Sequence, residues 1–197
     1  MRAPVDADGV RALARELGRV ARGDTTLYLT GGATAVIEGW RASTVDVDLR
    51  LEPESDELLK RIATVKDELD LNVELASPPD FIPELPGWRE RSPFLFREGR
   101  VHVRHFDPYS QALAKIERGF EQDLADVAAM VDGGFVDPAR ARAVLGDRAD
   151  ALSVSRNRPL RISSEGSAGV PWRRLKRALT GHCWTINPWA SGSTKLR

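Results

Sequence analysis

The first part of the chain alternates between helical and strand-like spacing of its apolar residues. Apolar positions recur at helical intervals over residues 7–22, which predicts an amphipathic helix. Residues 25–30 form a short β-branched and aromatic run, which predicts a strand that ends at Gly31 and Gly32. Residues 33–38 then return to a helical pattern. We therefore expect a helix, a strand, a glycine turn and a second helix in succession.

A strictly alternating segment, residues 44–51, follows this helix. Its apolar side chains share one face of a strand, whereas Asp46, Asp48 and Arg50 share the other. Residues 71–75 repeat the alternation. We expect two half-buried strands, the first of which carries paired carboxylates.

The segments around the second of these strands predict a helix and a hairpin. Residues 55–69 have a helical pattern with Ser55 as the N-cap. A proline-rich loop occupies residues 78–93, and residues 94–97 and 101–106 flank a glycine turn. This second arrangement is typical of an antiparallel hairpin.

The pattern becomes helical after the hairpin. Asp107 and Pro108 predict a helix start, and helical spacing covers residues 109–118, 120–132 and 137–151. Strands therefore precede helices along the chain. We expect an α/β (α+β) fold with a small mixed or antiparallel sheet, flanking helices and a helical C-terminal half.

Charge is divided unevenly along the 197 residues, which carry 29 Lys and Arg against 29 Asp and Glu. Residues 156–197 hold nine Lys and Arg and a single Glu, so the preceding residues have eight more acids than bases. This basic segment also contains Trp172, Trp184 and Trp189. Three interpretations stay open: it clamps an RNA backbone, it covers an apolar groove on the acidic body, or it is disordered.

Composition excludes several classes of protein. With 42% apolar residues the chain is globular, and its apolar runs are far shorter than the roughly 20 residues that span a bilayer. We expect no membrane contact and a cytoplasmic location. The single Cys183 excludes an internal disulfide and a cysteine-based zinc site. His102 and His105 point to opposite faces of a predicted strand, and we assign both to surface or hydrogen-bonding roles.

The paired carboxylates are candidate metal ligands. Asp46 and Asp48 lie two residues apart on one strand face, with Cα atoms roughly 7 Å apart. Oxygen ligands suit Mg²⁺ or Mn²⁺, and Glu74 on a neighbouring strand is the natural third ligand. For such a strand taken alone, the commoner alternative is a solvated face of an antiparallel sheet.

The glycine pair favours the metal site. Gly31 and Gly32 end a strand and open a helix, so their N–H groups are placed to face a phosphate. Thirteen residues separate them from Asp46-Val47-Asp48-Leu49. This spacing resembles the signature of the polymerase-beta-like nucleotidyltransferase superfamily, and residues 30–49 are similar to AbiEii-type nucleotidyltransferase toxins, including the MenT toxins of toxin–antitoxin pairs.

A second stretch, residues 114–130, resembles the later motifs of that group. It contains a Lys on a predicted helix, an Arg and two aspartates: Lys115, Arg118, Asp123 and Asp126. The spacing leaves open whether Asp123 or Asp126 fills the last motif position.

The resemblance implies a nucleotidyltransferase fold and a metal-dependent enzyme. Such a toxin transfers nucleotides from an NTP, with Mg²⁺ or Mn²⁺, to the 3′ end of tRNA, which blocks aminoacylation and translation. It also implies a protein antitoxin as partner. We expect residues 1–106 to form the catalytic core, residues 107–155 the helical part of the same unit, and residues 156–197 a separate basic tail.

The resemblance also implies a role for each motif residue. Asp46 and Asp48 would hold both ions, and Glu74 would contact the ion that activates the acceptor hydroxyl. Lys115 would bind the triphosphate; the alternative is a lysine that merely snorkels. Asp123 would orient Lys115 or contact the nucleotide, and the alternative is ordinary helix capping.

Two smaller features have open interpretations. Arg41, Ser43 and Thr44 directly precede the carboxylate strand, where they either contact the triphosphate or close the turn. Phosphorylation of either hydroxyl would add negative charge beside the carboxylates and block triphosphate entry. Phe81 and Trp88 in the proline-rich loop are interpreted as one packing patch, with base stacking as the alternative.

Two other functions compete with the toxin interpretation. An enzyme of the same fold could nucleotidylate a small molecule or a protein hydroxyl, which the acidic body favours. The chain could also be a catalytically silent binding module of this fold. The intact pairs Gly31-Gly32 and Asp46/Asp48 argue against the silent module, since binding alone does not require two converging metal ligands.

Overall fold

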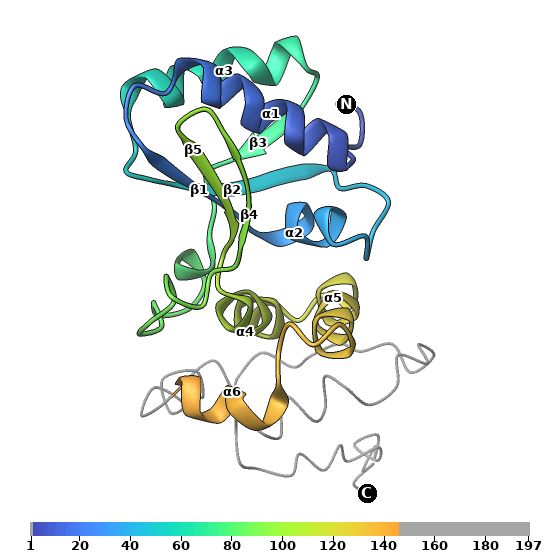
Figure 1. The fold of residues 1–197 in the computed structure, drawn as a ribbon. Helices are drawn as coiled ribbons and strands as arrows, with labels where there is room; N and C mark the ends of the chain where they lie inside the picture. The colour runs from blue at the N-terminus through green and yellow to red at the C-terminus, as the bar shows by residue number, and fades with distance from the viewer. Residues whose placement is uncertain (1, 146–197) are drawn as a thin grey trace, which may run out of the picture.

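A five-stranded mixed sheet forms the centre of the protein (Figure 1), in a computed structural model that describes residues 2–145. The strand order is β3-β2-β1-β5-β4. Strand β1 pairs antiparallel with β2 and parallel with β5, while β2–β3 is parallel and β4–β5 antiparallel. This arrangement confirms the expected α/β class with a small mixed sheet flanked by helices. The strands are β1 Thr25–Leu29, β2 Asp46–Glu52, β3 Asn72–Glu74, β4 Phe94–Glu98 and β5 Val101–His105.

Two helices cover one face of the sheet and create the main core (Figure 1). They are α1 (Ala7–Val20), which is capped by Asp6 through a hydrogen bond from the Gly9 N–H, and α3 (Asp56–Glu68). Each fully buried aliphatic side chain contributes about 1.5 to 3 kcal/mol to folding. The core side chains include Val10, Leu13 and Leu17 of α1, Leu58, Ile62 and Val65 of α3, and Val47, Leu49 and Leu51 of β2.

The alternation of β2 directs its polar side chains to the opposite face of the sheet. With Leu49 and Leu51 buried against the helices, Asp48 and Arg50 face away from them. The same face holds a small aromatic cluster in which Trp88 stacks on Phe106 with ring centroids 4.3 Å apart, and Tyr28 meets both rings edge-on.

The predicted Phe81–Trp88 patch is wrong. Trp88 is buried with Tyr28 and Phe106, whereas Phe81 is 47% exposed and lies beside Arg118. The two rings are seven residues apart in a loop whose turns, including a 3₁₀ turn at Pro78–Asp80, carry them into different surroundings.

Three C-terminal helices form a second core below the sheet (Figure 1). They are α4 (Pro108–Arg118), α5 (Glu121–Asp132) and α6 (Pro138–Leu145). The predicted start of α4 is confirmed, since the Asp107 carboxylate accepts a hydrogen bond from the Tyr109 N–H and Pro108 is the first helical residue. The rest of the third predicted helix, the basic residues 156–197 and Cys183 lie outside the described residues.

Helix α2 (Gly31–Ile37) connects the sheet to these helices. It begins at Gly31, two residues earlier than expected, because the glycines form its first turn. Trp40, just after it, meets Phe135 with ring centroids 5.1 Å apart. His105, at the end of β5, is buried between Thr34 and Glu38 of this region, with its Nε2 2.6 Å from a Glu38 oxygen. The hydrogen-bonding role expected of His105 is thus confirmed, and burial lowers its pKa.

Two other local details differ from expectation. Ser55 occupies the N-cap position of α3, but its hydroxyl makes no capping hydrogen bond in the described structure. Thr44 lies outside β2 and instead forms an isolated antiparallel bridge with Val5, whose backbone exchanges two hydrogen bonds with it. Within residues 2–145, no helix is both long enough and apolar enough to cross a membrane.

Candidate active site

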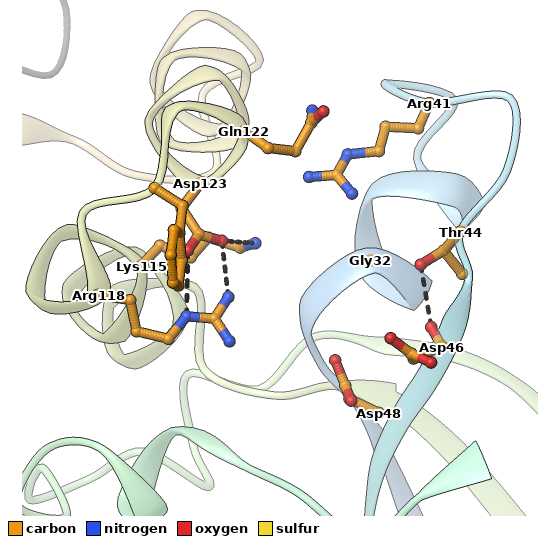
Figure 2. A pocket seen from close by; sticks show the side chains of 10 residues that line it. Gly32, Arg41, Thr44, Asp46, Asp48, Lys115, Arg118, Gln122 and Asp123 are labelled. Carbon is orange, nitrogen blue, oxygen red and sulfur yellow. Dashed lines mark hydrogen bonds and ion pairs between the residues drawn. The ribbon is translucent and has the colours of Figure 1, made fainter. Parts of the chain in front are cut away.

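A cleft of about 290 Å³ lies between the polar end of the sheet and the helices α4 and α5. Figure 2 shows two walls that face each other, one from the start of β2 and α2, the other from α4 and α5. The residues that line it are Gly32, Arg41, Thr44, Asp46, Asp48, Lys115, Arg118, Phe120, Gln122 and Asp123. The cleft therefore joins the two sequence segments that resemble nucleotidyltransferase motifs.

The sheet wall of the cleft carries Asp46 and Asp48, and strand β3 places Glu74, which is not among the lining residues, beside Asp48. In the parallel pairing of β2 and β3, Asp48 lies directly opposite Glu74 and Asp46 opposite Asn72, so all four side chains share one face. The Asn72 amide donates a hydrogen bond to the Asp46 carboxylate. Burial, followed by the charges of Glu74 and Asp46, raises the pKa of Asp48 to about 6. This wall therefore holds negative charge that a cation would stabilise.

The donor set of this wall fits a hard cation. All of its candidate ligand atoms are carboxylate oxygens, which Mg²⁺ and Mn²⁺ prefer. Among residues 2–145, however, no three His, Cys, Asp or Glu side chains already converge on a common point that could hold an ion. The carboxylates are neighbours that need further ligands, as expected where substrate phosphates complete the coordination of Mg²⁺.

The glycine pair allows the start of α2 to lie close to β2 and to Thr44. Gly31 has φ +59°, and a Cβ there would lie closer than 3.0 Å to an Asp48 carboxylate oxygen. A Cβ on Gly32 would lie equally close to the Thr44 hydroxyl. The Gly31 N–H donates a hydrogen bond to the side-chain oxygen of Gln111 at 3.1 Å.

The helical wall carries a network of cations and carboxylates. Lys115 is only 5% exposed, and its Nζ lies 2.6 Å from an Asp126 oxygen and 3.3 Å from an Asp123 oxygen. Arg118 donates two hydrogen bonds to Asp123, at 2.6 and 3.1 Å (Figure 2). Asp123 and Asp126 both contact Lys115, so both belong to this network, and Asp123 also lies in the first turn of α5, as the helix-capping alternative expects.

Arg41 connects the two walls. Although it lies 85 residues away in sequence, its guanidinium makes two hydrogen bonds to the Asp126 carboxylate, one of them at 2.8 Å. Asp126 therefore bridges Lys115 and Arg41. Three cations, Lys115, Arg118 and Arg41, share two buried carboxylates here, so each cation is held in place by an ion pair.

Of the predicted turn residues, Thr44 closes the turn. Its hydroxyl donates to the Asp46 carbonyl at 3.0 Å, and its backbone pairs with Val5. Thr44 is buried, although it lines the cleft, whereas Ser43 is exposed.

Sequence patterns missed four residues of this site. Gln111 supports Gly31 and also donates to the Phe106 carbonyl at 2.8 Å, and Asn72 orients Asp46. Phe120 and Gln122 line the cleft. Signals were available for Gln111, which shares a helix face with Lys115, and for Asn72, which shares an alternating strand face with Glu74.

The geometry agrees with what a comparison with protein families finds. Residues 10–156, about three quarters of the chain, match the family described as "Nucleotidyltransferase of unknown function (DUF6036)". Searches of curated proteins and of solved structures gave no match. The two walls of the cleft fall entirely within the matched residues. The chain therefore belongs to the DUF6036 family of nucleotidyltransferases.

Proposed function

We propose that the cleft binds an NTP and transfers its nucleotidyl group to an acceptor hydroxyl with the help of Mg²⁺ or Mn²⁺. The observation that carries this proposal is the opposition of two walls. Asp46 and Asp48 lie on one, with Glu74 beside Asp48 on the neighbouring strand, and a cationic network that includes Lys115 lies on the other. Carboxylates suit metal ions, and the cations suit a triphosphate.

The reaction forms a bond between the acceptor oxygen and the α-phosphorus, and it breaks the bond between that phosphorus and the oxygen that bridges to the β-phosphate. Pyrophosphate leaves, and the acceptor proton passes to solvent. Asp46, Asp48 and Glu74 would hold the metal. When bound, such ions neutralise charge that develops on the attacking and leaving oxygens. Lys115 would exchange its aspartate partners for phosphate oxygens and position the departing pyrophosphate.

Gly31 provides a test of whether transfer requires the Asp48 carboxylate to lie close to the start of α2. The Gly31→Ala variant is expected to lower transfer about 100-fold, because its Cβ would displace the Asp48 carboxylate. Gly39→Ala is the matched control, since Gly39 also has a positive φ but a Cβ there meets nothing within 4 Å. Both variants should lose about 1 kcal/mol of stability from backbone strain. Equal transfer rates in Gly31→Ala and Gly39→Ala would show that transfer does not depend on the close contact between Asp48 and Gly31.

For the acceptor, we propose the 3′ end of tRNA. Support comes from the resemblance of residues 30–49 and 114–130 to AbiEii-type toxins. Blocking that end would stop aminoacylation, so the protein would act as a toxin with a protein antitoxin as its partner. The basic residues 156–197 would provide phosphate contacts for the RNA.

A second candidate acceptor is a small molecule or a protein hydroxyl. Residues 1–155 carry eight more acids than bases, and such a surface repels the RNA backbone unless the basic tail compensates.

The two candidates are separated by supplying total tRNA, a protein extract and an aminoglycoside as acceptors, each with Mg²⁺ and α-labelled NTP. Wild type is expected to lengthen tRNA, resolved at single-nucleotide resolution, and the Asp46→Asn variant to leave it unchanged. Label on protein or on the aminoglycoside instead would support the second candidate. No label on any acceptor would contradict both and favour a silent binding module.

A further inference from the structure

One exposed aromatic ring lines the cleft and a second contacts a lining residue, and neither has a role in phosphate or metal binding. Phe120 is 64% exposed and lines the cleft, and Phe81 is 47% exposed. Burying a phenyl ring is worth about 2 to 3 kcal/mol, so a ring left open at a binding cleft marks a surface available to a ligand.

Arg118 joins these two rings. It lines the cleft with Phe120, and its guanidinium carbon lies 5.2 Å from the centre of the Phe81 ring. Its two hydrogen bonds to Asp123 hold the guanidinium in one orientation. We call Phe81, Arg118 and Phe120 together the aromatic rim.

The backbone fixes the rim in place. Phe120 is the N-cap residue of α5 and directly follows Gly119, whose φ of +71° ends α4. Both helices are connected by the ion pairs of Lys115 with Asp123 and Asp126. Phe120 is therefore presented from a rigid corner between two helices, on the wall opposite Asp46 and Asp48.

The chemistry of the rim suits a nucleobase. Aromatic rings and planar guanidinium groups stack on bases, and such stacking tolerates any base because every base has a π-face. A triphosphate held between Asp48 and Lys115 would leave its nucleoside in the same cleft, which Arg118 and Phe120 of the rim also line.

We propose that the aromatic rim is a nucleobase-binding site that stacks on the base of the incoming NTP and accepts all four bases. It rests on the proposed function, since only a nucleotide substrate brings a base to this cleft. The base of the NTP and the last base of an RNA acceptor present the same stacking surface, so the binding test below distinguishes these two sources.

Phe94 offers a matched control. It is 53% exposed on β4, and the guanidinium carbon of Arg104 lies 5.8 Å from its ring centre. It thus reproduces the Phe–Arg pair of the rim, but it is not among the residues that line the cleft. Isolated exposed rings of this kind are common on protein surfaces.

The test measures equilibrium binding to the full chain in Mg²⁺, with three probes: each of the four NTPs, inorganic tripolyphosphate, and an eight-nucleotide single-stranded RNA. Phe120→Ala is expected to weaken binding of all four NTPs about ten-fold, while tripolyphosphate binding stays unchanged. Phe81→Ala should have a smaller effect in the same direction. Phe120→Tyr should retain wild-type affinity, and Phe94→Ala should bind all probes as wild type does.

The remaining outcomes identify the source of the base or overturn the proposal. Weaker RNA binding with unchanged NTP binding would assign the rim to the base of the acceptor. An equal loss for tripolyphosphate would show general damage to the cleft and overturn a base site. If Phe120→Ala binds NTP and RNA as wild type does, and wild type still transfers nucleotides, the base site is overturned but the proposed function is not. If wild type itself binds neither NTP nor RNA, the proposed function is overturned as well.

Discussion

Replacing Asp48 by Asn should abolish nucleotidyl transfer and at the same time stabilise the metal-free protein. The variant keeps the shape of the side chain but removes a charge that the proposed metal ions would need. Loss of several kcal/mol of transition-state stabilisation corresponds to a rate about 10³-fold lower. In the absence of metal, the same charge is unfavourable, because Asp48 is partly buried beside Glu74 and Asp46.

The pH dependence of this stabilisation follows from the raised pKa. The Asp48 carboxyl titrates near pH 6 when folded, against a usual value of 3.8, so the folded state binds more protons between those values. Wild type therefore loses stability as pH rises from about 4 to 6, and the variant avoids that loss. At pH 7.5 the variant should be more stable by about 3 kcal/mol.

Chemical denaturation in EDTA at pH 4 and pH 7.5 measures this difference. We expect the variant and wild type to have similar stability at pH 4 and to diverge at pH 7.5. Asp46→Asn is the matched comparison, because the Asp46 carboxylate already accepts a hydrogen bond from Asn72. It should lose transfer with a smaller gain in stability. An Asp48→Asn variant that is less stable than wild type at pH 7.5 would contradict the crowding of negative charge on this wall.

The second large effect is expected for Lys115→Met, which should be destabilised by about 3 kcal/mol. Lys115 is nearly buried between Asp123 and Asp126, and removing its charge deprives two buried carboxylates of a cation and leaves Arg118 and Arg41 as their remaining partners. For a chain of this size, the melting temperature should fall by about 6 to 12 °C. Transfer should also be lost, because no cation remains to meet the triphosphate at this position.

A double variant separates the structural from the catalytic role of this lysine. Lys115→Met combined with Asp126→Asn removes one positive and one negative charge, and it should recover most of the lost stability. Transfer should stay absent, since the phosphate-binding cation is still missing. Recovery of transfer in the double variant would mean that Lys115 serves only to neutralise Asp126.

The side of the sheet on which Asp46 and Asp48 lie was predictable, because alternation along a strand has a period of two. The segment with Glu74 shows the same alternation. That Glu74 lies opposite Asp48 depends on the register of two parallel strands, which local pattern does not specify. The sheet and the order of helices were also confirmed, since long periodic segments fix element type.

Contacts between distant segments were not predictable. Arg41 meets Asp126 across 85 positions, and Gln111 meets Gly31 across 80. Such pairs depend on how the helical part packs against the sheet, and local periodicity does not predict that packing. The same limitation explains the error at Phe81 and Trp88, where neighbouring loop residues pack in separate places.

Nucleotidyl transfer by this cleft is tested most directly with NTP labelled either at the α- or at the γ-phosphate. Wild type and the Asp46→Asn and Asp48→Asn variants are incubated with Mg²⁺ and total RNA, and the label in acceptor and in released products is compared. We expect wild type alone to transfer the α-label, with all γ-label released as pyrophosphate. Transfer of the γ-label, or α-label transfer that survives in both variants, would contradict a nucleotidyltransferase that works through these carboxylates.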